Sequence, residues 1–126
     1  MSARSELRLI RPHERSADTQ QTGGMTREAA IASARLWSGI VRAAPGMSSG
    51  WHHHGEYETS IYVIKGRARF EFGVGGASAV EARQGDFVHV PPGAVHRESN
   101  PESEEAVFAI TRAGSGVPVV NVEGPA

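Results

Sequence analysis

Hydrophobic and polar residues alternate along short segments of the chain, a spacing typical of β-strands with one buried face. Between residues 67 and 72, alanine and phenylalanine at even positions alternate with arginine and glutamate at odd positions. The segment 59–66 is rich in β-branched and aromatic residues, which is typical of a central strand. The same criteria predict further strands at 34–46, 78–86, 86–93, 94–100 and 105–113, and edge strands at 6–11 and 117–122.

Glycine and proline separate these segments, with 15 glycines and 7 prolines in 126 residues. Only residues 25–34, MTREAAIASA, have the composition of a helix. We therefore expect residues 1–34 to form an N-terminal arm that contains a loop or a short helix. Roughly eight short strands with one helix at most predict a single domain over residues 1–126, folded as an antiparallel β-sandwich or barrel.

Composition and charge exclude several classes of function. Thirteen basic and fourteen acidic residues give a net charge of -1, so neither nucleic acid nor an anionic membrane is expected as a partner. No apolar run reaches the roughly 18–20 residues of a membrane span, and the first residues lack the apolar region of a signal peptide. We therefore expect a cytoplasmic protein. The chain has no cysteine, so any bound metal must be held by nitrogen and oxygen atoms.

The segment GMSSGWHHHGEYET, residues 46–59, holds three of the six histidines of the chain. His52 and His54 are two residues apart, so an extended chain directs both to one side and His53 to the other. Glu58 is four residues after His54, so an extended chain would direct it to the same side as His52 and His54. A further histidine, His96, follows a Pro-Pro-Gly turn on another predicted strand. Imidazoles and a carboxylate that converge from two strands are typical of a metal site.

Two segments resemble the paired motifs of the cupin superfamily. The first motif is a glycine, five residues, H-x-H, three or four residues, a glutamate, six residues and a glycine, and it corresponds to residues 46–66 here. The second is a glycine, five residues, P-x-G, two residues, a histidine, three residues and an asparagine. It matches residues 85–100, GDFVHVPPGAVHRESN, at every position.

This resemblance implies an all-β jelly-roll fold, the double-stranded β-helix barrel of a small single-domain cupin. It also implies one divalent transition-metal ion (Fe, Mn, Zn, Ni or Co) held by His52, His54, Glu58 and His96. A homodimer is expected from the resemblance, and because the predicted edge strands need to be covered.

The first motif departs from the family pattern at one point, because seven residues rather than six separate Glu58 from Gly66. Side-chain alternation counted forward from His52 and His54 places Glu58 on the side that faces the metal. Alternation counted back from Gly66 places Thr59 there instead. A β-bulge near residues 58–59 would allow both. The alternatives are a three-histidine site in which Thr59 faces the metal, and a cluster that binds no metal.

Three histidines and one carboxylate leave open positions on a five- or six-coordinate ion, as a catalytic site requires. We therefore expect a metal-dependent enzyme, an isomerase, lyase or dioxygenase, that acts on a small polar, carboxylate or sugar-like molecule. The alternatives are a non-catalytic module that binds or senses a small ligand, and a metal-free sugar-modifying barrel in which histidines act as acid and base. The fold does not choose among these reactions.

Overall fold

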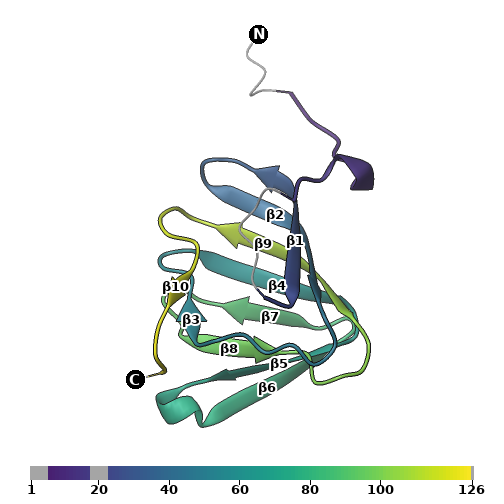
Figure 1. Ribbon diagram of the computed structural model, residues 1–126. Helices are drawn as coiled ribbons and strands as arrows, with labels where there is room; N and C mark the ends of the chain where they lie inside the picture. The colour runs from purple at the N-terminus through teal and green to yellow at the C-terminus, as the bar shows by residue number, and fades with distance from the viewer. Residues whose placement is uncertain (1–5, 18–22, 126) are drawn as a thin grey trace.

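The computed structural model describes residues 6–17 and 23–125. From Met25 onward the chain forms two antiparallel β-sheets that face each other (Figure 1). The first sheet has the order β1-β2-β9-β4-β7 and contains β1 (Met25–Ala32), β2 (Leu36–Ala43), β9 (Ala106–Ala113), β4 (Glu58–Lys65) and β7 (Phe87–Val90). The second has the order β10-β3-β8-β5-β6 and contains β10 (Val120–Asn121), β3 (His52–His53), β8 (His96–Ser99), β5 (Arg67–Phe72) and β6 (Ser78–Arg83).

The helical content of the described residues is limited to two 3-10 turns, η2 (Pro12–Glu14) and η3 (Val74–Gly76). The all-β jelly-roll expected from the sequence is therefore confirmed. None of these short turns has the length and apolar character that a helix needs to cross a membrane.

The hydrophobic core lies between the two sheets because alternate residues of each strand face inward. On β4, Thr59, Ile61 and Val63 are buried, and across the ladder Ile61 pairs with Ile110 of β9. On β5, Phe70 is buried while its charged neighbours are not. Each fully buried large apolar side chain stabilises the fold by about 1.5–3 kcal/mol relative to an exposed one. The largest members of the core are Met25, Val41, Met47, Ile61, Val63, Phe70, Val90, Phe108 and Ile110.

The N-terminal part differs from the sequence prediction. Met25–Ala32 is the strand β1, which pairs with β2 along its length, and the expected short helix is wrong. Helix propensity is a weak preference that pairing and burial override here, since Met25, Arg27 and Ala29 alternate into the barrel interior. The edge strand expected at 6–11 is also wrong, because these residues form no strand and lie outside the two sheets (Figure 1).

The two motif segments meet at Gly46 and Asn100. The Gly46 N–H donates to the Asn100 carbonyl (2.9 Å), and the Asn100 N–H donates to the Met47 carbonyl (3.0 Å). Gly46 has φ 71°, a left-handed conformation that suits glycine. This junction fixes the start of the first motif against the end of the second, and so sets the histidines of both motifs in register.

Candidate metal centre

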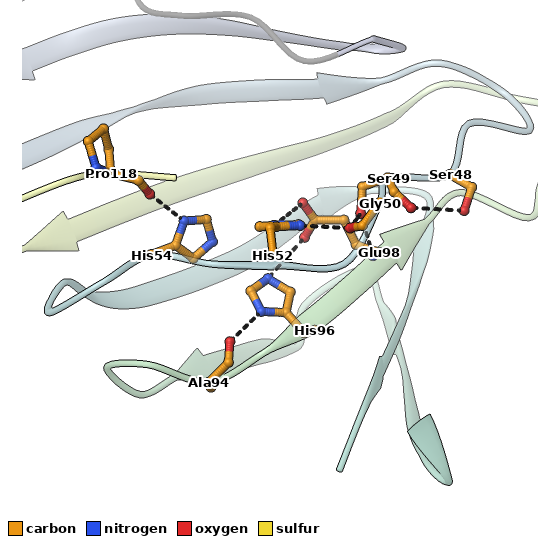
Figure 2. Close-up of polar contacts among 9 residues, drawn as sticks. All are labelled: Ser48, Ser49, Gly50, His52, His54, Ala94, His96, Glu98 and Pro118. Carbon is orange, nitrogen blue, oxygen red and sulfur yellow. Dashed lines mark hydrogen bonds and ion pairs between the residues drawn. The ribbon is translucent and has the colours of Figure 1, made fainter. Parts of the chain in front are cut away.

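His52 and His96 lie on neighbouring strands of the second sheet, and His54 lies in the turn that follows β3. His52 is the cross-strand partner of His96 in the β3–β8 ladder. The three ring centroids are 4.4 Å (His52–His96), 5.1 Å (His52–His54) and 5.2 Å (His54–His96) apart, and all three residues are buried (Figure 2). The parity argument for His52 and His54 is confirmed, because His53 lies outside the cluster and its Nδ1 accepts the Gly55 N–H (3.0 Å).

Each of the three rings is held by a hydrogen bond from Nδ1 to a backbone carbonyl. His52 Nδ1 bonds the Gly50 carbonyl (2.8 Å), His54 Nδ1 the Pro118 carbonyl (2.8 Å), and His96 Nδ1 the Ala94 carbonyl (2.9 Å) (Figure 2). A carbonyl only accepts, so Nδ1 carries the proton, and in a neutral ring the Nε2 lone pair is free. Fixing the tautomer in this way is how proteins orient metal-binding imidazoles.

One potential ligand atom from each of the three histidines lies within 4.8 Å of the other two. His96 Nε2 is buried and has no hydrogen-bond partner among the described residues. A buried polar atom of this kind is unfavourable unless a ligand completes it. Three imidazoles whose Nδ1 atoms are bonded to carbonyls therefore fit the donor set of a transition-metal ion.

The structure does not bring Glu58 to this cluster, and its predicted position is corrected. Glu58 lies on the outer face of β4 with 59% of its side chain exposed, and its Oε2 is 2.6 Å from His89 Nε2. Thr59 takes the inward position and is buried, as in the alternative derived from Gly66.

The error came from extending strand parity through a turn. β3 ends at His53, and the Tyr57 N–H donates to the His54 carbonyl (3.0 Å), so the alternation does not continue to Glu58. Six residues separate Thr59 from Gly66, so the first motif has no extra residue once Thr59 takes the inward position. The bulge of β4 lies between Val63 and Lys65, where two of its residues oppose one of β9.

A different carboxylate, Glu98, lies beside the histidines and was missed by the sequence reasoning. Its Oε1 is 3.7 Å from His52 Nε2 and its Oε2 is 3.9 Å from His96 Nε2, with 13% of the side chain exposed (Figure 2). Glu98 follows His96 by two residues on β8, so the two side chains share one face. The parity rule that was applied to His52 and His54 would have placed it on the same face as His96.

Burial favours the neutral form of His52 and His54, which is the form that binds a metal. Burial lowers the pKa of His54 to about 3, and the hydrogen bond to Pro118 only partly opposes this. Burial also lowers the pKa of His52, and the negative charge of Glu98 opposes the shift. Because imidazoles bind metals as neutral groups, both shifts favour binding at a lower pH than the ordinary histidine pKa would allow.

The shifted pKa of His54 predicts that the metal-free protein loses stability in acid. Between its folded pKa of about 3 and its unfolded pKa near 6.5, only the unfolded chain takes up the proton. The contribution of His54 to the free energy of unfolding should therefore be fully present above pH 6.5. The loss of this contribution alone should lower the free energy of unfolding by about 2 kcal/mol between pH 7 and pH 5. Urea unfolding in the presence of EDTA measures this pH dependence.

His54→Gln should flatten the pH dependence of the free energy of unfolding, whereas His13→Gln, at an exposed site, should not. Equal pH dependences in wild type and His54→Gln would contradict the assignment.

A cleft of about 510 Å³ reaches the cluster from the side of the barrel where β6 and β7 form the sheet edges. It is bounded by side chains of β5, β6 and β7, among them Phe72, Val80 and Phe87, and His96 contributes to its wall. A second cavity of about 360 Å³ lies on the side of β1 and β2, where Pro118, the hydrogen-bond acceptor of His54, contributes to its wall. His96 therefore borders on space that a small molecule can occupy.

Comparison with known proteins gives a family and several similar folds. The sequence pattern of the family described as Cupin domain matches residues 39–111, more than half of the chain. No functionally curated sequence shows a significant match. The polyketide cyclase RemF from Streptomyces resistomycificus is similar in structure, with 19% identity and a TM-score of 0.77 over 93% of this chain and 86% of that one.

Two further structures show the same fold. A protein with a double-stranded β-helix domain from Klebsiella pneumoniae subsp. pneumoniae MGH 78578 has 22% identity and a TM-score of 0.72 over 94% of this chain and 99% of that one. A mutant of the oxalate decarboxylase OxdC from Bacillus subtilis has 24% identity and a TM-score of 0.68, over 82% of this chain and 29% of that one. At these identities the similarity extends to the fold alone.

Proposed function

The chain belongs to the cupin family, and on this basis we propose that it is a metal-dependent enzyme acting on a small polar molecule. The observation that supports this most is the set of three buried imidazoles, each with Nδ1 bonded to a carbonyl and with ligand atoms within 4.8 Å of one another. His52, His54 and His96 would hold one divalent transition-metal ion, and Glu98 is the nearby carboxylate. Nitrogen and oxygen donors of this kind suit Fe, Mn, Zn, Ni or Co.

The residues around the histidines would have different roles in a reaction. A bound divalent ion would supply Lewis-acid polarisation of a substrate oxygen. The Nδ1 hydrogen bonds keep the imidazoles oriented, and the barrel walls exclude bulk water from the buried cluster. Glu98 is placed to hold a proton next to His52 and His96, since its two oxygens face one ring each.

The enzyme hypothesis is favoured over a non-catalytic binding module by two observations. A cleft of about 510 Å³ reaches His96, which gives a substrate access to the cluster. Two of the proteins with similar structures, the polyketide cyclase and the oxalate decarboxylase, are enzymes. The reaction class stays within isomerase, lyase or oxygenase chemistry.

Metal analysis of protein purified without a histidine tag tests the proposal. We expect about one divalent ion per chain, since one three-histidine cluster is present among the described residues. Turnover of a panel of small acids and sugars by metal-loaded protein, with oxygen uptake recorded for the Fe(II) form, then separates oxygenase from redox-neutral chemistry. Ligand binding without turnover across the panel would favour the binding module, and a chain without metal after loading would refute the metal site.

We also propose that the protein is a homodimer. Leu7 and Leu9 of the N-terminal segment are exposed, as is Phe87 on the edge strand β7. Exposed apolar side chains and uncovered sheet edges are features that a second copy of the chain would bury. Light scattering should give twice the mass of one chain. The mass of a single chain at high protein concentration would contradict the proposal.

A further inference from the structure

Two arginines are buried in the barrel interior, on the sheet that faces the histidine-bearing strands. Arg27 of β1 is 6% exposed and Arg112 of β9 is 5% exposed. A buried charge is strongly unfavourable unless an opposite charge compensates for it. Arg112 forms no ion pair with any residue that the structure describes, and its buried Nε has no hydrogen-bond partner there. Its guanidinium lies 5.6 Å from the ring centroid of Trp37, a contact that orients the cation without neutralising it.

Charges of both signs act on Arg112. Burial lowers the pKa of Arg112, and the positive charge of Arg27 lowers it further. Glu98 is the carboxylate that acts on both guanidinium groups, and its two oxygens face His52 and His96. A divalent ion at the histidines would add positive charge to this region of the barrel.

Arg112 contributes to the wall of the cavity of about 360 Å³ on the β1–β2 side of the barrel. Trp37, Tyr57 and Pro118 also border it, which gives the cavity aromatic and apolar walls. The Pro118 carbonyl accepts the hydrogen bond from His54 Nδ1, so Pro118 connects this wall to one residue of the histidine cluster. A molecule in this cavity would contact Arg112 and Pro118.

We propose that Arg112 is the anion-binding residue of the site and that it binds the carboxylate of a small organic acid with a compact apolar or aromatic body. This rests on the proposed function, whose substrate class it narrows. A carboxylate matches the planar fork of a guanidinium, and it would form the ion pair that Arg112 does not make with any described residue. Trp37 and Tyr57 contact the body of the acid. A neutral sugar would leave the buried cation uncompensated and is therefore disfavoured.

Calorimetric titration with benzoate tests the proposal, with the uncharged analogue benzamide and inorganic phosphate as comparison ligands. The titrations use metal-loaded protein and protein treated with EDTA. Benzoate should bind both forms and benzamide should bind neither. Arg112→Met, which keeps the length of the side chain and removes its charge, should weaken benzoate binding at least about 10-fold. Arg83→Met, at an exposed position of β6, is the matched control and should bind as wild type does.

Thermal unfolding of the same variants separates a binding role from a structural one. Removing an uncompensated buried charge should leave the stability of Arg112→Met equal to or above that of wild type. Unchanged benzoate affinity in Arg112→Met, or a clear loss of stability without a loss of binding, would overturn the proposal. So would equal binding of benzamide, or tighter Arg112-dependent binding of phosphate than of benzoate.

The two proposals fail in distinguishable ways. If Arg112→Met keeps its metal content and its benzoate affinity, only the anion site is wrong. If wild-type protein binds no metal but binds benzoate through Arg112, only the metal-dependent function is wrong.

Discussion

Protein carrying His96→Ala should retain little bound metal after dialysis, with an affinity at least about 100-fold below that of wild type. His96 is the one member of the cluster that comes from β8, so its loss leaves the ion held from one side by His52 and His54. Loss of residues that only support metal ligands already lowers affinity about 10–100-fold, and loss of a ligand should exceed this. Metal content measured by mass spectrometry, together with competition against a chelator, gives the affinity.

Three further variants serve as comparisons for His96→Ala. Glu58→Ala should keep full occupancy, because Glu58 bonds His89 on the outer face of the barrel. His53→Ala should also keep it, because this ring lies outside the cluster. Glu98→Gln should weaken binding less than His96→Ala does, since all three imidazoles remain. Loss of metal in Glu58→Ala would show that Glu58 contributes to the site, and retention of metal in His96→Ala would show that these histidines are not the site.

Asn100→Ala should lower the free energy of unfolding of the metal-free protein by about 3 kcal/mol or more. Asn100 is 1% exposed, and its Nδ2 donates to the carbonyls of Ala43 (3.1 Å), Ala44 (3.3 Å) and Glu104 (2.8 Å). Its Oδ1 accepts the Glu102 N–H (3.0 Å). Alanine leaves these backbone groups without partners at the junction of the two motif segments. Urea unfolding with EDTA measures the change.

Asn121→Ala is the matched control for this substitution. Asn121 is exposed on the short strand β10, so its replacement should change the free energy of unfolding by no more than about 0.5 kcal/mol. A loss below about 1 kcal/mol in Asn100→Ala would mean that the asparagine does not hold the junction together.

The strands and the histidine cluster were accessible from local sequence patterns. Period-two alternation at 67–72 and β-branched residues at 59–66 predicted strands that the structure confirms as β5 and β4. The spacing of His52 and His54 predicted that they share a side, because only two residues of extended chain are involved. His96 was a candidate because it follows a Pro-Pro-Gly turn on another predicted strand, and the resemblance of the second motif then assigned it to the ligand set, since no local rule relates residues 42 positions apart in the chain.

Other features depended on contacts between distant segments. Residues 25–32 have helix-forming composition, but pairing with β2 makes them a strand and places Arg27 in the interior. The position of a bulge depends on the partner strand, and here β9 places it between Val63 and Lys65 rather than near Glu58. Strand parity holds only within an unbroken extended segment, and the turn from His54 to Tyr57 ended it.

The carboxylate and the cation of the site were therefore decided by the tertiary structure. Glu98 and Arg112 have the parity of buried residues on their strands, but charged residues with that parity usually lie on solvated faces. Only the packing of the two sheets encloses them, directing Glu98 towards His52 and His96 and leaving Arg112 without an ion pair among the described residues. Local patterns determine which way a side chain points along its own strand, whereas its burial and its partners depend on the strands that pack against it.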